Sequence, residues 1–150
     1  MKNPLILQIR KIFDKILSYR FVKFLIVGFS GIIVNMALLY MLTEIAGLYY
    51  MFSSIVAIEI SIISNFFLNN FWTWKEREKG NIYSKIVKYH ITTGISAIFG
   101  NWLILVVLTE LFGMYYLLSN LIGIAVGTIS NYLINDLWTF NKKYHDKIDH

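Results

Sequence analysis

The stretch Ser53–Trp74, SSIVAIEISIISNFFLNNFWTW, carries a small or amide residue at every fourth position of an otherwise apolar run. The stretch Ser119–Phe140, SNLIGIAVGTISNYLINDLWTF, repeats this pattern 66 positions later. A spacing of four keeps such residues on one face of an α-helix. On an otherwise apolar helix, a stripe of this kind is expected to face protein or a polar cavity, while the apolar residues face lipid. The members of the stripe are Ser53, Ala57, Ser61, Asn65 and Asn69 in the first stretch, and Ser119, Gly123, Gly127, Asn131 and Asn135 in the second.

The composition points to a membrane protein. The chain has 150 residues, of which 57% are hydrophobic and only 15% are charged. A soluble domain of this length rarely has so few charges. The formal net charge of +5 does not indicate nucleic-acid binding, because all 14 Lys and Arg residues fall into three blocks, at residues 1–23, 75–88 and 142–147. Cysteine is absent, which excludes disulfides.

Four apolar segments lie between these basic blocks, and each is close to the ~20 residues that cross a bilayer. The positive-inside rule places both termini and the middle basic loop in the cytoplasm. Aromatic pairs at the segment ends agree with this orientation. The sequence therefore predicts an all-α protein of the cytoplasmic membrane with four transmembrane helices, over Val22–Leu42, Ser53–Trp72, Lys88–Leu108 and Leu117–Trp138.

The two halves of the chain align without gaps at an offset of 66. About a third of the positions in 21–75 are identical in 87–141, including polar residues that shared hydrophobicity would not produce. The sequence predicts two tandem helical hairpins that run parallel, because each crosses the membrane an even number of times. We expect a four-helix domain over residues 21–141, and a polar cleft where its two repeats meet.

Two terminal segments flank this domain. Apolar and charged residues alternate at helical spacing in residues 1–20, which predicts an amphipathic helix on the cytoplasmic membrane surface. A solvated leader that only carries topogenic charge is the alternative. Residues 142–150 are predicted to form a basic cytoplasmic tail.

Amides within the apolar segments are the first candidates for a site. They pair at the offset of 66, so each hairpin carries the same set. Interhelical hydrogen bonding explains such residues structurally, and the lining of a polar cleft explains them functionally. The candidates are Asn65, Asn69, Asn131 and Asn135, with Asn35 and Asn101 as helix-packing amides and Trp72 and Trp138 at the interface.

Other residues have more specific interpretations. Glu59 is an intramembrane carboxylate whose repeat counterpart is Ala125, so it is a candidate for proton coupling. Small residues permit close helix approach, and Gly28, Gly94, Gly123 and Gly127 are candidates for this role. His90, His145 and His150 lack a metal-ligand spacing, and no phosphate loop, nucleophile elbow or cofactor motif occurs. From these observations we expect a protein without metal, without cofactor and without enzymatic activity.

The chain resembles the GtrA-like family over about residues 20–141. The resemblance rests on Arg20-Phe21-Val22-Lys23-Phe24 and Val27-Gly28, and on the motif Asn65-Phe66-x-x-Asn69-x-x-Trp72-Thr73-Trp74. This motif returns as Asn131-Tyr132-x-x-Asn135-x-x-Trp138-Thr139-Phe140. The sequence departs from the family pattern at Asn70 and Asp136, where a basic residue is common in the family.

The resemblance implies a role in cell-surface polysaccharide synthesis. Its expected substrate is a polyprenyl-phosphate-linked monosaccharide, which the protein would flip across the membrane. The alternative is a non-catalytic membrane subunit that anchors or stabilises a polyprenyl-phosphate glycosyltransferase. In the flipping interpretation the amides and both tryptophans bind the substrate, while Lys23, Lys75 and Lys88 attract its phosphate at the cytoplasmic side. Four helices can enclose a sugar only incompletely, so we also expect a homodimer.

Overall fold

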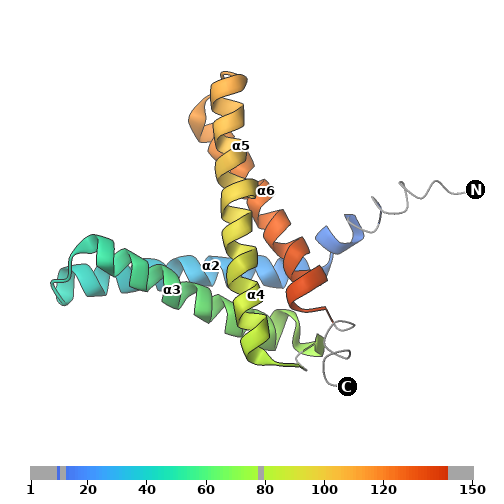
Figure 1. The fold of residues 1–150 in the computed structure, drawn as a ribbon, viewed down its shortest axis with the longest axis horizontal. Helices are drawn as coiled ribbons and strands as arrows, with labels where there is room; N and C mark the ends of the chain where they lie inside the picture. The colour runs from blue at the N-terminus through green and yellow to red at the C-terminus, as the bar shows by residue number, and fades with distance from the viewer. Residues whose placement is uncertain (1–9, 11–12, 78–79, 142–150) are drawn as a thin grey trace, which may run out of the picture. The chain divides into compact units, whose positions relative to one another are not determined.

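The computed structural model describes residue 10 and residues 13–77 and 80–141. All regular elements in this part of the chain are helical. The predicted amphipathic helix over residues 1–20 lies largely outside the described residues, and the predicted tail over residues 142–150 lies entirely outside them. The chain divides into two compact units, Met1–Glu78 and Lys79–His150, and each forms a helical hairpin (Figure 1).

Unit 1 consists of two long helices joined by a tight turn. Helix α2 (Tyr19–Tyr40) begins at Ser18, whose Oγ accepts a hydrogen bond from the Phe21 N–H at 3.3 Å. It ends in the π-helical turn η1 (Met41–Ile45), and Gly47 then reverses the chain at φ +69°. Helix α3 (Tyr50–Leu68) returns alongside α2, and it continues into η2 (Asn69–Thr73) and the short 3₁₀ helix η3 (Lys75–Arg77).

Unit 2 is also a hairpin of two long helices joined by a tight turn. Helix α4 (Ile82–Ile95) is capped by Asn81, and it continues without a break through η4 (Ser96–Trp102), α5 (Leu103–Val106) and η5 (Val107–Leu111). Gly113 turns the chain at φ +64°, and α6 (Tyr116–Ile134) returns against η4 and α5 before ending in η6 (Asn135–Thr139).

The hydrogen bonds that define the turns also recur at the offset of 66. The Leu48 N–H donates to the Leu42 carbonyl at 3.0 Å, and the Met114 N–H donates to the Leu108 carbonyl at the same distance. At the other end of each hairpin, the Trp74 N–H reaches the Asn69 carbonyl at 2.8 Å, and the Phe140 N–H reaches the Asn135 carbonyl at 2.9 Å. The two hairpins therefore share their turn and their terminal π-helical geometry.

Three helices are long and apolar enough to cross a membrane: Tyr19–Ile45, Phe52–Thr73 and Ile82–Leu111. The all-helical class and the membrane class are thus confirmed, whereas a fourth crossing, by α6, stays a prediction. The search for spanning helices covered only described residues, and the side chains of Tyr116 and Leu117 at the start of α6 are not among them. In the rest of α6 and in η6, the mean hydropathy is lowered by Asn120, Asn131 and Asn135.

Helix α4 begins earlier than the sequence predicted. The basic stretch up to Val87 was expected to be a loop, but the helix starts at Ile82. The Asn81 Oδ1 accepts hydrogen bonds from the N–H groups of Tyr83 at 2.8 Å and Ser84 at 3.3 Å, which satisfies donors that a helix start leaves free. Lys85 consequently lies on a helix rather than in a loop, and Lys88, the predicted first residue of the helix, lies inside it.

Within each hairpin, the two helices pack closely at glycines that face the other helix. A Cβ built on Gly100 would lie 2.6 Å from the Gly127 Cα, so the backbones of η4 and α6 meet there directly. A Cβ on Gly31 would overlap the Asn65 side chain. Gly123 and Gly127 also contact the facing helix, whereas Gly28 and Gly94 have no atom within 4 Å of the position that a Cβ would take.

These contacts predict opposite outcomes for two glycines on one continuous helix. Gly100→Ala is expected to destabilise the protein by about 1–3 kcal/mol, because the facing backbone cannot move aside for a methyl group. Gly94→Ala is expected to be neutral or slightly stabilising, since alanine favours a helix where space is open. Unfolding of both variants in detergent, followed by circular dichroism, measures the difference. Equal stability of the two variants would contradict the close approach of η4 to α6.

Candidate functional site

Each hairpin carries a groove between its two helices. In unit 1 the groove has a volume of about 230 Å³. Its lining residues recur at three, four and seven positions on both helices, which places each set on one helix face. They are Gly28, Gly31, Ile32 and Asn35 from α2, and Ile58, Ser61, Ile62 and Asn65 from α3.

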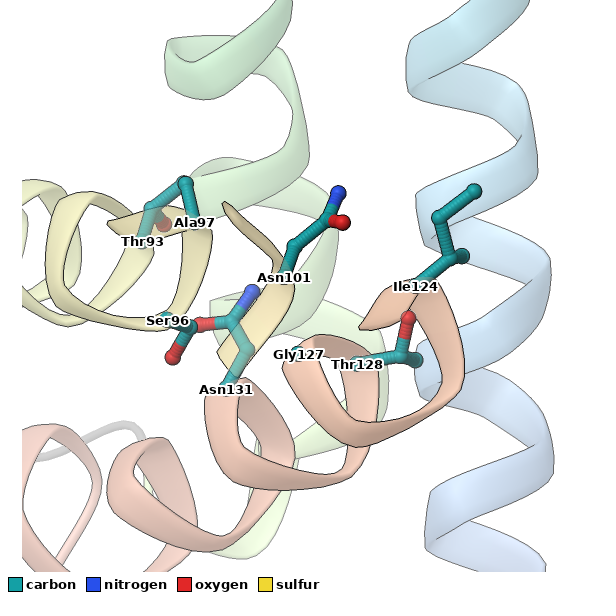
Figure 2. A pocket seen from close by; sticks show the side chains of 8 residues that line it. All are labelled: Thr93, Ser96, Ala97, Asn101, Ile124, Gly127, Thr128 and Asn131. Atoms are coloured by element: carbon teal, nitrogen blue, oxygen red, sulfur yellow. The ribbon is translucent and has the colours of Figure 1, made fainter. Parts of the chain in front are cut away.

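The groove of unit 2 has a volume of about 180 Å³ and lies between the end of α4 with η4 on one side and α6 on the other (Figure 2). Six of its eight lining residues correspond to the lining of the first groove at the offset of 66. The lining consists of Thr93, Ser96, Ala97 and Asn101 on one side, and Ile124, Gly127, Thr128 and Asn131 on the other. The duplicated sequence has therefore produced two equivalent grooves, one within each unit.

The second groove lies near the middle of its helix. Ser96 is 14 residues beyond Ile82, which corresponds to about 21 Å along an α-helix. The continuous helix Ile82–Leu111 has 30 residues. An α-helix of that many residues is longer than the ~30 Å of hydrocarbon that a spanning helix must cross. In a membrane-spanning arrangement, the polar lining therefore lies deep in the bilayer.

Both grooves contain buried oxygen atoms without a hydrogen-bond partner among the described residues. In unit 1 this atom is Asn65 Oδ1. In unit 2 they are Thr93 Oγ1, Ser96 Oγ and Asn101 Oδ1. An unpaired polar group in a lipid environment costs several kcal/mol, so these atoms favour a bound ligand or water within the grooves.

The amides pack against glycine in both units, but from opposite helices. In unit 1, Asn65 of α3 covers Gly31 of α2, whose carbonyl accepts a hydrogen bond from Ser61 Oγ at 2.8 Å. In unit 2, Asn101 of η4 covers Gly123 of α6, where a Cβ would lie 2.8 Å from Asn101 Oδ1. One close amide–glycine contact per hairpin holds the helices together beside each groove.

The six predicted amides divide into two groups. Asn35 and Asn65 line the first groove, and Asn101 and Asn131 line the second. Asn69 and Asn135 line neither groove and are almost fully buried at the start of the terminal π-helical turns. Asn69 Oδ1 accepts a hydrogen bond from Thr73 Oγ1 at 2.8 Å, and Asn135 Nδ2 donates to Asn131 Oδ1 at 2.8 Å. Asn135 thus orients an amide of the groove.

The lysines and tryptophans lie at the ends of the hairpins, outside the grooves. Lys23 Nζ lies 5.0 Å from the ring centre of Tyr19 and 5.6 Å from that of Trp72. Lys88 Nζ lies 5.8 Å from the ring centre of Trp138, and this lysine is buried. Lys75 is exposed in η3. The cation–π geometry holds the first two ammonium groups against aromatic faces.

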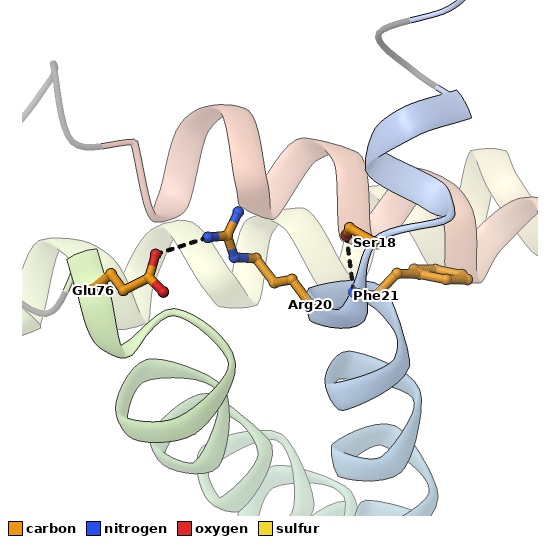
Figure 3. Close-up of polar contacts among 4 residues, drawn as sticks. All are labelled: Ser18, Arg20, Phe21 and Glu76. Atoms are coloured by element: carbon orange, nitrogen blue, oxygen red, sulfur yellow. Dashed lines mark hydrogen bonds and ion pairs between the residues drawn. The ribbon is translucent and has the colours of Figure 1, made fainter.

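An ion pair fixes the same end of unit 1. Arg20 Nη2 donates to Glu76 Oε2 at 3.1 Å, close to the Ser18 cap of α2 (Figure 3). Glu76 is largely exposed, so this pair contributes little to stability and mainly relates the start of α2 to η3. Glu59 is exposed on α3 and does not line the groove.

Sequence reasoning missed several residues of these grooves. Thr93 and Thr128 occupy positions that are Val27 and Ile62 in the first repeat. Outside the grooves, Lys85 was also missed; it is fully buried, with its Nζ 6.0 Å from the Phe140 ring centre. Differences between the repeats were the available signal for the two threonines. Among the described residues, no group of three or more His, Cys, Asp or Glu side chains could hold a metal ion.

The fold and the grooves define a helical membrane protein with duplicated polar sites between its helices. The model of the GtrA/DPMS transmembrane domain matches residues 23–98 and 90–150. The chain belongs to this family, as its resemblance to GtrA-like proteins predicted.

One curated relative of this chain is named as an enzyme. The chain is 40% identical over 116 residues to a dolichol-phosphate mannosyltransferase of Pyrococcus furiosus. The match covers 77% of this chain and 32% of the relative, so the chain spans about a third of that protein's length.

This relative contradicts the expectation that the protein has no enzymatic role. The expectation rested on the absence of catalytic motifs from an apolar sequence. A membrane-spanning segment can belong to an enzyme whose reacting groups lie elsewhere, so the absence of such motifs from the segment does not exclude enzymatic function.

The contacts of Asn135 lead to a prediction for the second groove. Asn135→Ala is expected to destabilise the protein by about 1–2 kcal/mol, because it removes two hydrogen bonds to Asn131, at 2.8 and 2.9 Å. Asn120→Ala, on the same helix but outside the groove, is the matched control and is expected to change stability by less than about 0.5 kcal/mol. Thermal unfolding in detergent measures both. A control that loses as much stability as Asn135→Ala would refute the specific role of Asn135.

Proposed function

We propose that the protein binds a polyprenyl-phosphate-linked monosaccharide within the membrane and carries it from the inner to the outer leaflet. The observation that supports this proposal is the pair of equivalent grooves, each with buried oxygen atoms that lack hydrogen-bond partners among the described residues. Sugar hydroxyls supply the donors that amide and hydroxyl oxygens need. Membership of the GtrA/DPMS family is in keeping with a lipid-linked sugar as the ligand.

The distribution of charge gives the substrate a direction of approach. Its phosphate meets Lys23, Lys75 and Lys88 at the basic end of the hairpins, while its polyprenyl chain stays among the lipids. The sugar enters the grooves beyond Trp72 and Trp138, and Asn35, Asn65, Asn101 and Asn131 receive it. Asn135 orients the lining amide Asn131, and Asn69 accepts a hydrogen bond from Thr73; neither contacts the sugar in this proposal. In this account Glu59 remains a candidate for proton coupling.

The proposal includes four membrane crossings by two parallel repeats, with both termini in the cytoplasm. The positive-inside rule supports this orientation, and the equivalent turns at Gly47 and Gly113 support the parallel repeats. Each groove is smaller than the ~300 Å³ at which typical ligand pockets begin, so we propose that a homodimer completes the site.

A second candidate function is that of the membrane domain of a polyprenyl-phosphate glycosyltransferase, located in the same polypeptide or in a partner. The similarity to a third of a dolichol-phosphate mannosyltransferase favours this candidate. The grooves would then hold the lipid-linked product, or its acceptor lipid, beside a catalytic domain. Both candidates require the same ligand class, and they differ in whether the headgroup crosses the bilayer.

A flipping assay in proteoliposomes tests the first candidate. Vesicles that contain the purified protein are expected to expose an inner-leaflet polyprenyl-phosphate-linked hexose to an external, membrane-impermeant oxidant. The double variant Asn101→Leu/Asn131→Leu is expected to slow this exposure at least about tenfold, because two hydrogen-bonding amides are lost. Asn120→Leu removes an amide outside the groove and is expected to behave as the wild type.

The assay also separates the two candidates. If the wild-type protein exposes no more lipid-linked sugar than protein-free vesicles do, the flipping proposal is wrong. A rise in polyprenyl-phosphate glycosyltransferase activity on co-expression would then support the second candidate.

A further inference from the structure

The two grooves differ in their capacity to bind hydroxyl groups. At the offset of 66, Val27 and Ile62 of unit 1 are replaced by Thr93 and Thr128 in unit 2. The second groove has five polar lining residues, whereas the first has three. Thr128 replaces Ile62 in the lining, and Thr93 and Ser96 join the lining although their counterparts Val27 and Ser30 do not line the first groove. In the opposite direction, Gly127 replaces Ser61.

The hydroxyl groups of the two units also differ in their hydrogen bonding. In unit 1, Ser61 Oγ donates to the Gly31 carbonyl at 2.8 Å, and Ser30 Oγ donates to the Val27 carbonyl at 2.8 Å. In unit 2, the counterpart of Ser30 is Ser96, which is only 4% exposed and lines the groove. Its Oγ has no hydrogen-bond partner among the described residues, and the same is true of Thr93 Oγ1. Both of these hydroxyls in unit 1 therefore have a carbonyl partner, whereas unit 2 leaves two available.

Serine and threonine in helices commonly satisfy their hydroxyl by donating to a carbonyl in the preceding turn. Ser30, Ser53 and Ser119 do so in this protein, at 2.8, 3.3 and 3.4 Å. Ser96 and Thr93 differ from them because the hydroxyl oxygens remain unpartnered inside the groove, close to Asn101 and Asn131 in the lining (Figure 2). In lipid, such an arrangement within a groove favours a polar occupant.

We infer that the groove of unit 2 is the sugar-recognition subsite, in which Thr93, Ser96 and Asn101 hydrogen-bond to the hydroxyls of the lipid-linked monosaccharide. The groove of unit 1 is its less polar counterpart and does not select for the sugar. This inference rests on the proposed function, which supplies the substrate class. It adds which hairpin discriminates sugar-bearing lipid from sugar-free lipid, and through which side chains.

Binding measurements on the full-length protein in detergent test the inference. The probes are polyprenyl phosphate without sugar and a panel of polyprenyl-phosphate-linked glucose, mannose and galactose, with affinities measured by native mass spectrometry. The wild type is expected to prefer at least one sugar-bearing lipid over polyprenyl phosphate. Thr93→Val/Ser96→Ala is expected to lose that preference by about tenfold, while its affinity for polyprenyl phosphate stays unchanged.

Two matched variants control for structural effects. Ser30→Ala removes the corresponding hydroxyl from unit 1, and Thr109→Val removes an equally buried and unpartnered hydroxyl outside the groove. Both are expected to retain the preference of the wild type. Thr128→Val, in the facing helix, is a second groove variant and is expected to weaken the preference without affecting the Thr93 and Ser96 positions. Circular dichroism and size-exclusion profiles verify that each variant is folded.

The possible results separate this inference from the function on which it rests. A wild type that binds every sugar-bearing lipid no better than polyprenyl phosphate would overturn both. A wild-type preference that survives in Thr93→Val/Ser96→Ala and in Thr128→Val would overturn only the assignment to unit 2. An equal loss of affinity for both classes of lipid would also overturn it, because the groove would then support the fold or hold the phosphate.

Discussion

Inside hydrocarbon, an amide or hydroxyl group must find its hydrogen-bond partner within the protein, a ligand or trapped water, because lipid chains offer none. This constraint explains why four amides of so apolar a chain, Asn35, Asn65, Asn101 and Asn131, lie on the helix faces that line the grooves. In both hairpins these faces are turned toward the other helix, where Asn65 covers Gly31 and Asn101 covers Gly123. Large apolar side chains such as Phe29, Ile55 and Leu121 are left exposed on the remaining faces. Lipid or further helices can cover those faces at no hydrogen-bonding cost.

The same constraint separates structural amides from candidate binding groups. Asn69 and Asn135 have hydrogen-bond partners at the terminal π-helical turns, and they are buried. Asn65 and Asn101, which line the grooves, carry buried oxygen atoms without such partners among the described residues, whereas the unpartnered Asn135 Oδ1 belongs to a residue outside both grooves. A duplicated helical hairpin therefore contains both the fixed contacts that hold its helices together and the polar atoms that favour an occupant. Divergence between the repeats at Thr93 and Thr128 makes one of the two grooves more polar.

Much of the fold could be predicted from the sequence. The hydrophobic runs, the stripe of period four and the offset of 66 indicated the helices, their pairing and their turns. The start of α4 was misplaced because the basic residues between positions 75 and 88 suggested a loop, whereas the Asn81 cap begins a helix there. The glycine contacts were only partly predictable. The sequence shows that Gly28 and Gly31 share a helix face, but only the three-dimensional packing shows that Asn65 lies over Gly31.

The limits of sequence reasoning were greater for the site and for the class of activity. Asn69 and Asn135 were expected to line a polar cleft, and Asn35 and Asn101 to serve helix packing, yet Asn35 and Asn101 line grooves, while Asn69 and Asn135 do not. This distinction depends on which groups the π-helical turns bring together, and residue spacing alone does not reveal it. The expectation of a non-enzymatic protein failed for a different reason. It treated the chemistry of a membrane segment as that of a whole protein, whereas the mannosyltransferase relative is about three times as long as the matched stretch.

The central claim is that each hairpin holds a polar groove that contains water or ligand at membrane depth. The absence of native cysteine permits a direct measurement, in which single cysteines in lipid nanodiscs react with a water-soluble maleimide. Ala97→Cys and Thr128→Cys place the thiol in the second groove, and Phe99→Cys places it on an exposed apolar face. The account predicts that the two groove thiols react readily and that the Phe99→Cys thiol does not. Unreactive groove thiols, as well protected as the thiol at position 99, would contradict it.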